Sequence, residues 1–264
     1  MEDIAKECFI IGSGRSLLNL TSEEREYVNG HPHTLAMNKF YLFYEKVGIE
    51  PTALFMADTR FPTHRVVTEI IDKARQSAKQ PTYYLENYYV NLFCKPYIHP
   101  LWNTRERLRL LRMNRYIAPL WVNYPRVRSF RHLQGVYDGF GWAKSLDEPL
   151  YWLHGSLTTA INLAFIIYPG CDIKLIGVDL QGPEPFFDEE LRVRPDLMDA
   201  GYLRNLRVGQ HHTAIASKNG VTMLQAIVDL IKPALAKERI RLLCCTSDSL
   251  LVSENICEYA NIVS

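Results

Sequence analysis

Polar residues that could hold a nucleotide follow several short apolar runs of this chain. The first run ends in Gly12-Ser13-Gly14-Arg15-Ser16, where glycines let the backbone approach a phosphate or sugar and serines add hydroxyl and amide donors. Later runs are followed by Asn38, by Asp58, by Asp179 and by the pair Thr246-Ser247. Ligands of an open parallel sheet bind outside the carboxyl ends of its strands, so these residues together predict one binding cleft.

The glycine-rich turn departs from the standard nucleotide motifs. The dinucleotide fingerprint requires a third glycine where this chain has Leu17, and the Walker pattern requires a Gly-Lys-Ser/Thr that is absent. Asn38 also stands where a nicotinamide-binding domain has an acidic residue. A tight turn without a ligand is the alternative interpretation of this segment.

Three histidines are candidates for acid–base chemistry. His211 and His212 precede a predicted C-terminal helix, where either could take a proton from an acceptor hydroxyl. A surface or helix-capping role is the alternative for both. His154 is a further candidate, and Gly155 and Ser156 after it could present backbone amides to a phosphate or carboxylate at the start of an apolar helix. A simple N-cap is the alternative for Ser156.

Two strand-end carboxylates could take part in metal binding. Asp58 and Asp179 would hold Mg²⁺ together with phosphates if both faced one cleft, and a cap or turn role is the alternative. The chain has no Asp-x-Asp motif, and its six cysteines show no metal-ligand spacing. We therefore expect no tightly bound metal, no cofactor, and cysteines that are buried free thiols.

The elements that must position these residues alternate along the chain. Short apolar runs predict strands, and helical patterns follow them, which is typical of an α/β fold with a mainly parallel sheet and helices on both faces. The expected strands are Phe9–Ile11, Thr34–Met37, Ala53–Met56, Ile173–Ile176 and Ile240–Cys244. The expected helices are Glu23–Val28, Tyr41–Val47, Thr63–Ser77, Gly155–Ile167 and Asn219–Lys237.

Two segments interrupt this alternation within a single domain over residues 1–264. Residues 181–212 form a long polar stretch after a strand, which is typical of a functional lid. Residues 83–150 are rich in aromatics and prolines and predict an irregular excursion beside the sheet. Arginines of this excursion would attract an anionic substrate or a membrane surface, or form a solvated helix face or a subunit contact: Arg105, Arg107, Arg109, Arg112, Arg115, Arg126, Arg128 and Arg131.

The charge and the apolar segments of the chain limit the partners and the location that we expect for the protein. The formal net charge of +1 gives no reason to expect nucleic acid binding. The N-terminus lacks the basic and apolar regions of a signal peptide, and the apolar stretch Leu157–Pro169 is too short to span a bilayer. We expect a cytoplasmic protein, with contact to the inner face of the membrane left open by the arginine-rich segment.

Six pieces of the chain, taken in order, resemble the bacterial sialyltransferases of glycosyltransferase family 42. The resemblance covers most of the chain outside residues 83–150. It implies a single Rossmann-like, GT-A-like domain that uses a CMP-activated sialic acid without a metal. The pieces are Ile10–Leu17, Ala36–Tyr41, Gly155-Ser156, Ile176–Asp179, Ser217–Asn219 and Cys245–Leu251.

The resemblance also implies roles for single residues. Ser13, Ser16 and Asn38 would hold the nucleotide and its ribose, Ser156 would lie near the sugar carboxylate or the cytosine, and residues 181–210 would be the lid.

The chain departs from the family at its base and in its lid. The family has a histidine base immediately before Ser-Lys-Asn, where this chain has Ala216, so His212 is the expected base. In place of two lid tyrosines that neutralise the leaving phosphate, the region offers Gln181, Phe186 and Phe187. Lid arginines would then stabilise the phosphate, and the candidates are Arg192 and Arg194.

A related group, the 6-hydroxymethylpterin diphosphokinase-like proteins, is similar in the glycine-rich loop, in Asn38-Lys39, and in the positions of Asp58 and Asp179. This second resemblance implies ATP, Mg²⁺ and diphosphate transfer.

The resemblance to the sialyltransferases implies transfer of a sialic acid or similar acidic sugar from a CMP-activated donor to a glycan hydroxyl, in the synthesis of cell-surface polysaccharide or lipooligosaccharide, and this is the function that we expect. The Mg²⁺-dependent diphosphokinase and a catalytically silent nucleotide-binding protein stay open as alternatives, as does a homo-oligomer.

Overall fold

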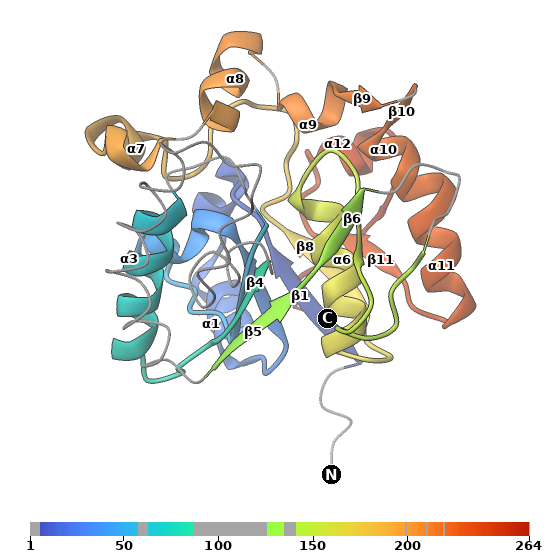
Figure 1. Cartoon of the computed structure of the whole chain (residues 1–264), viewed down its shortest axis with the longest axis horizontal. Coiled ribbons are helices and arrows are strands. Elements are labelled where there is room, and N and C mark those ends of the chain that lie inside the picture. Colours follow the sequence, from blue (N-terminus) through green and yellow to red (C-terminus); the bar gives the residue numbers. More distant parts are fainter. Residues whose placement is uncertain are drawn as a thin grey trace, which may run out of the picture.

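The centre of the protein is a sheet of eight strands that run parallel to one another. The computed structural model describes residues 6–57, 63–86, 126–134, 141–198, 200–209, 211–218 and 220–263. The strand order is β12-β11-β8-β1-β2-β3-β4-β5. Figure 1 shows the sheet at the centre of the molecule, with helices around it. The strands are β1 (Glu7–Ile11), β2 (Thr34–Met37), β3 (Ala53–Met56), β4 (Thr82–Glu86), β5 (Val127–Phe130), β8 (Asp172–Ile176), β11 (Leu242–Cys244) and β12 (Glu258–Tyr259). The predicted α/β class with a mainly parallel sheet is confirmed, and all five expected strands are present.

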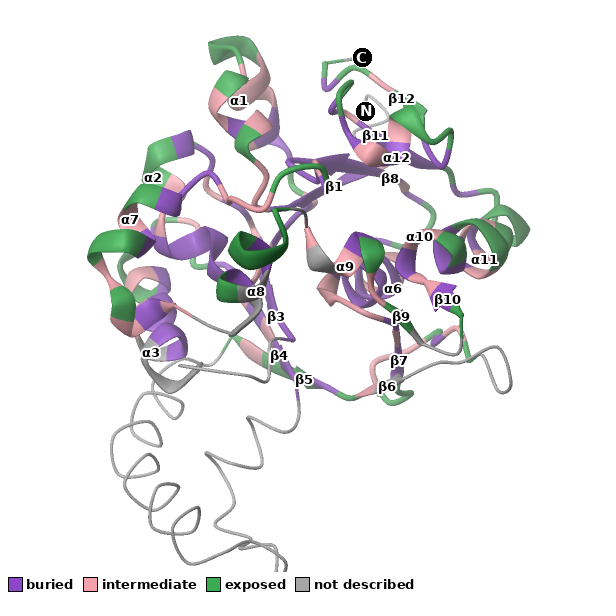
Figure 2. Ribbon diagram, turned by 90° about the horizontal axis from the view of Figure 1, so that it is seen from above, coloured by how far each residue is buried: buried purple, intermediate pink, exposed green. Residues whose placement is uncertain are grey.

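Helices cover both faces of the sheet, which explains why its strands are apolar throughout. In β1, Cys8 and Ile10 pack into one core, and Phe9 and Ile11 pack into the other. The first core is closed by α6, α10 and α11, and the second by α1, α2 and α3; Figure 2 shows the two groups on opposite sides of the sheet. These helices are α1 (Ser22–Gly30), α2 (Tyr44–Val47), α3 (Thr63–Gln76), α6 (Ser156–Ile167), α10 (Met223–Ala226) and α11 (Lys232–Lys237).

The strand order reverses beside β1. From β1 the chain builds outward through β2, β3, β4 and β5, then returns to the other side of β1 with β8 and continues outward through β11 and β12. The chain from β1 to β2 passes through α1 on one face of the sheet, and the chain from β8 to β11 returns through α10 and α11 on the other face. Such a switch point is where doubly wound sheets bind their ligands.

Two predicted segments differ from the structure. The expected helix Asn219–Lys237 begins only at Met223, because Val221–Thr222 (β10) pairs back onto Ser217–Lys218 (β9) as a short hairpin. A wider π turn at Ile227–Ile231 then joins α10 to α11. The expected helix Tyr41–Val47 is a 3₁₀ helix, Asn38–Leu42, followed by the short α2.

The expectation that residues 83–150 lie beside the sheet is wrong for the residues of β4 and β5, which belong to the central sheet. β4 and β5 extend the central sheet, and the described remainder includes a separate parallel pair, β6 (His132–Gln134) and β7 (Leu150–Trp152). Residues 87–125 and 135–140 lie outside the described residues, as do the arginines from Arg105 to Arg115. Arg126, Arg128 and Arg131 donate to backbone carbonyls, of Gln80, Val127 and Asp147 respectively.

The segment 181–212 folds over the ends of the strands as short helices. They are α7 (Asp188–Val193), a 3₁₀ turn at Pro195–Leu197 and α8 (Ala200–Val208); α9 (His212–Ile215) follows. Phe186, Phe187 and Leu191 are buried in the core formed with α1 to α3. The segment is therefore packed onto the body of the protein, and we call residues 181–212 the lid.

Candidate functional site

A cavity of about 770 Å³ lies at the switch point of the sheet. The loops after β1 and β8 form one part of its wall, through Gly12–Ser16 and Gly177–Leu180. The start of α6 and the end of β2 form another part, and the lid contributes Glu184, Tyr202 and Asn205. The fold thus brings the polar ends of several strands to one cavity, as the sequence predicts.

Asp179 anchors the glycine-rich loop. Its two carboxylate oxygens accept hydrogen bonds from the Ser16 amide at 2.9 Å and from the Ser16 hydroxyl at 2.5 Å. The amides of Gly12 and Gly14 donate to the carbonyls of Ile176 and Gly177 at 2.8 and 2.7 Å. Three amides of the loop, those of Gly12, Gly14 and Ser16, thus donate within the protein, and these bonds fix the loop against the end of β8.

Gly12 and Gly14 of this loop must be glycines because the atoms of the β8 loop leave no room for a Cβ. A Cβ at Gly12 would lie 2.3 Å from the Gly177 carbonyl oxygen, and a Cβ at Gly14 would lie 2.3 to 2.4 Å from the Asp179 carboxylate. Real Cβ atoms do not come so close to other heavy atoms, so any larger residue would push the loop away from β8.

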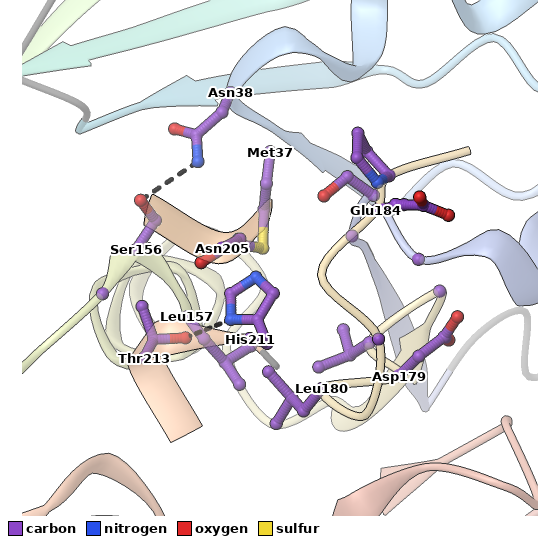
Figure 3. A pocket seen from close by; sticks show the side chains of 18 of the residues that line it. Met37, Asn38, Ser156, Leu157, Asp179, Leu180, Glu184, Asn205, His211 and Thr213 are labelled. Carbon is purple, nitrogen blue, oxygen red and sulfur yellow. Dashed lines mark hydrogen bonds between the residues drawn. The ribbon is translucent and has the colours of Figure 1, made fainter. Parts of the chain in front are cut away.

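A hydrogen bond joins the end of β2 to the start of α6. Asn38 donates from its side-chain nitrogen to the Ser156 hydroxyl at 3.0 Å (Figure 3). Gly155 is the N-cap of α6, with no side-chain cap, so the positive end of this 12-residue helix faces the cavity wall. An anionic group of a ligand would be stabilised there.

The backbone is strained at three positions of the cavity wall. Asn38, His154 and Leu180 have positive φ angles of 52°, 52° and 61°, and all three line the cavity. A left-handed backbone is costly for residues other than glycine and is found at functional sites, where the surrounding structure enforces it. Three other described residues with a positive φ, Gln80, Arg239 and Asn255, do not line the cavity, so this strain agrees with the location of the site but is not confined to it.

His211 points into the cavity. Its Nδ1 atom lies 2.6 Å from the Thr213 hydroxyl, and Figure 3 shows the ring among Leu157, Asn205 and Leu180. The Thr213 contact fixes the orientation of the imidazole, which is what a general base requires. His212 is the first residue of α9, and its side chain lies outside the described residues.

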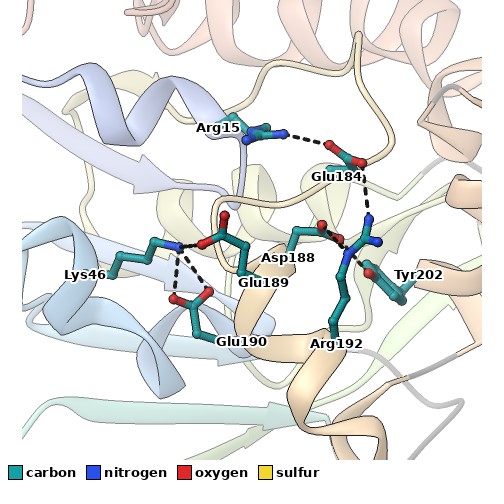
Figure 4. A network of polar contacts seen from close by, with 8 residues as sticks. All are labelled: Arg15, Lys46, Glu184, Asp188, Glu189, Glu190, Arg192 and Tyr202. Carbon is teal, nitrogen blue, oxygen red and sulfur yellow. Dashed lines mark hydrogen bonds and ion pairs between the residues drawn. The ribbon is translucent and has the colours of Figure 1, made fainter.

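Charged side chains connect the lid to the glycine-rich loop. Arg15 donates to Glu184 at 2.7 Å, Arg192 lies 3.5 Å from the same carboxylate, and Arg192 also donates to Asp188 at 2.8 Å (Figure 4). Tyr202 of α8 donates to Asp188 at 2.5 Å. Burial, together with this hydrogen bond, raises the pKa of Tyr202 to about 12, so the phenol keeps its proton at neutral pH.

The other predicted site residues take different places. Arg194 is turned toward Glu69 of α3 and toward Asp196, at 2.7 and 3.0 Å. Ser247 is exposed and donates to Asp248, whereas Thr246 lines the cavity 3.3 Å from the Ser16 hydroxyl. Asp58 lies outside the described residues. Those that line the cavity are Gly12, Ser13, Gly14, Ser16, Asn38, His154, Gly155, Ser156, Asp179, His211 and Thr246.

Sequence reasoning missed three groups that the lid brings to the cavity. Tyr202 and Asn205 lie three residues apart on α8, and both are buried and line the cavity. Their spacing is the signal that could have found them, because it puts both on the inner face of the helix. Glu184 has no such signal, since it lies in an irregular stretch between prolines.

The part of the chain that the structure describes holds no group of three or more histidine, cysteine, aspartate or glutamate side chains that could bind a metal ion. Its five cysteines, Cys8, Cys171, Cys244, Cys245 and Cys257, are free thiols. No described helix is both long enough and apolar enough to cross a membrane.

Comparisons of the chain with models of known families, with curated proteins and with solved structures return no match. The assignment of a function therefore depends on the cavity and its residues.

Proposed function

We propose that the protein transfers a sialic acid or similar acidic sugar from a CMP-activated donor to a glycan hydroxyl, in the cytoplasm, as a step in making cell-surface polysaccharide or lipooligosaccharide. The observation that carries the proposal is a single cavity at the switch point into which His211 points, between the glycine-rich loop, the start of α6 and the lid. A base, an anion-stabilising helix end and a covering segment are what transfer from a nucleotide sugar requires.

The nucleotide lies between the glycine-rich loop and β2 in this proposal. Because Gly12, Gly14 and Ser16 donate their amides within the protein, the Ser13 side chain and Asn38 make the direct contacts. The start of α6, at Ser156, faces the negatively charged part of the donor.

The reaction uses His211 as the base. His211 takes the proton of the acceptor hydroxyl as its oxygen forms a bond to the anomeric carbon of the sugar. The bond from that carbon to the phosphate oxygen breaks, and CMP leaves with the electron pair. Arg192, on the lid, stabilises the charge that develops on the phosphate. Arg194 supports the lid instead, because Glu69 and Asp196 hold it.

No metal takes part in this scheme. The carboxylate of Asp179, the described residue of the two proposed Mg²⁺ ligands, accepts two hydrogen bonds from Ser16. Its role in the proposal is to hold the loop, so no described contact favours the diphosphokinase alternative. A nucleotide-binding protein without turnover is the second candidate, and the presence of Ala216 in the cavity wall, where the resembling family has its base, favours it.

The proposal is tested by release of CMP from CMP-N-acetylneuraminate in the presence of a panel of oligosaccharide acceptors. His211→Ala should lower turnover by about 10²- to 10⁴-fold, the usual contribution of a general base, and leave the dissociation constant of CMP unchanged. His212→Ala is the matched control and should keep turnover. Full activity of His211→Ala with loss in His212→Ala would move the base to His212, and CMP binding without turnover by the parent protein would establish the silent alternative.

A further inference from the structure

Two arginines from different elements converge on one carboxylate at the edge of the cavity. Arg15 of the glycine-rich loop donates to Oε2 of Glu184 at 2.7 Å, and Arg192 of α7 lies 3.5 Å from Oε1 of the same residue. Figure 4 shows Glu184 between the two guanidinium groups. Arg15 and Glu184 both line the cavity. Each oxygen of the Glu184 carboxylate therefore meets an arginine of its own.

Arg192 is oriented by the lid helices before any ligand arrives. Its Nε atom donates to Asp188, which also accepts the hydroxyl of Tyr202 and is 8% exposed. The hydrogen bond to Asp188 raises the pKa of Arg192. Because α7 and α8 hold the guanidinium on this side, it loses little freedom when it binds an anion.

We propose that Arg15 and Arg192 form the subsite for an oxyanion of the ligand, and that Glu184 occupies this subsite until the ligand displaces it. The inference rests on the proposed function, which offers two sources of the oxyanion, the phosphate of CMP and the carboxylate of the acidic sugar. Both present a pair of oxygens like those of Glu184, which arginines bind through parallel N–H donors.

The position of Arg15 favours the phosphate of CMP, rather than the carboxylate of the sugar, as the oxyanion that binds in this subsite. Arg15 lies between Gly14 and Ser16, in the loop after the first strand of a doubly wound sheet, where nucleotide phosphates lie. Glu184 leads directly into Pro185 and Phe186, and the Phe186 amide donates to the Ser13 carbonyl at 2.9 Å. An anion on Arg15 would repel the Glu184 carboxylate, so binding at the subsite changes the contact between the lid and the loop.

The experiment measures dissociation constants of the full chain by calorimetry for CMP, cytidine, N-acetylneuraminate and inorganic phosphate. Glu184→Gln keeps the shape of the side chain but removes the competing charge, and should tighten CMP about tenfold while leaving cytidine unchanged. Arg15→Ala should weaken CMP by about the same factor. Glu189→Gln is the matched control: it makes the same charge change on the lid, at a side chain that is 83% exposed, and should leave CMP binding unchanged.

The arms of the experiment separate the possible results. Tighter N-acetylneuraminate with unchanged CMP in Glu184→Gln would keep the subsite and assign it to the sugar carboxylate. A third result is that the protein binds neither CMP nor cytidine but binds inorganic phosphate, and binds it more tightly after Glu184→Gln. This result would keep the subsite and reject the proposed donor. Two results would overturn the subsite while leaving the proposed function in place. In one, Glu184→Gln and Glu189→Gln change the dissociation constant of CMP equally. In the other, that constant is the same in the parent, Glu184→Gln and Arg15→Ala. Failure of Glu184→Gln to bind any of the four probes would also overturn it.

Discussion

Replacing Asp179 by alanine should loosen the glycine-rich loop and destabilise the protein. The change removes both acceptors of Ser16, at 2.9 and 2.5 Å. A hydrogen bond to a charged group contributes about 1.5–3 kcal/mol, and Asp179 is half-buried, so the lower end applies to each bond. We therefore expect the free energy of unfolding to fall by about 3 kcal/mol.

Urea denaturation of the parent protein, Asp179→Ala, Ser16→Ala and the double variant measures this effect. Ser16→Ala removes only the hydroxyl donor and should cost about half as much, because the Ser16 amide still donates. The double variant should cost less than the two single changes added together, with a coupling of about 1–2 kcal/mol, since both act on one contact. CMP affinity should fall in Asp179→Ala, because the loop no longer holds its position. Additive effects of the two changes, or an Asp179→Ala protein as stable as the parent, would refute the anchoring role.

Three further predictions concern stability. Gly12→Ala should cost about 1–3 kcal/mol because its Cβ would lie 2.3 Å from a backbone carbonyl, whereas Gly30→Ala, with no atom within 4 Å of the added Cβ, should change stability little; urea denaturation would show whether the two differ. Burial lowers the pKa of His31, so the unfolded chain binds more protons below about pH 6.5, and stability should fall as the pH drops from 6.5 to 5. His31→Phe should flatten that slope, and an unchanged slope would exclude His31 as its source. Tyr202→Phe should cost about 1.5–3 kcal/mol in the same assay, because the hydroxyl donates to the buried carboxylate of Asp188, and a variant as stable as the parent would contradict this.

The parts of the fold that were predictable have local causes. The runs in β2 and β3 are apolar on both faces, so Thr34–Met37 and Ala53–Met56 could be placed at the bounds that the structure shows. β4 and β5 could not be placed, because Tyr83, Tyr84 and Arg128 resemble a surface segment until a neighbouring strand pairs with them. The hairpin before α10 was missed for a similar reason: the helical spacing continues through Val221, but pairing with Lys218 decides its conformation.

The sequence could predict those candidate site residues that directly follow a strand. The ends of β1, β2 and β8 meet at one edge of any parallel sheet, which is why Ser16, Asn38 and Asp179 could be grouped before the structure was known. Their roles were not predictable, because the bond from Ser16 to Asp179 joins positions far apart in the chain. Because His211 and His212 are adjacent, spacing could not decide which of them enters the cavity, and the structure places His211 in the cavity wall.

Binding of CMP in the absence of metal is the measurement that decides whether CMP is part of the donor. The dissociation constant of CMP, and the melting temperature with CMP, would be measured with EDTA and with Mg²⁺, beside ATP, UDP and GDP under both conditions. CMP should bind and stabilise the protein equally with EDTA and with Mg²⁺, and Asn38→Ala should weaken this binding. Stabilisation by ATP that requires Mg²⁺, with none by CMP, would contradict the proposed donor.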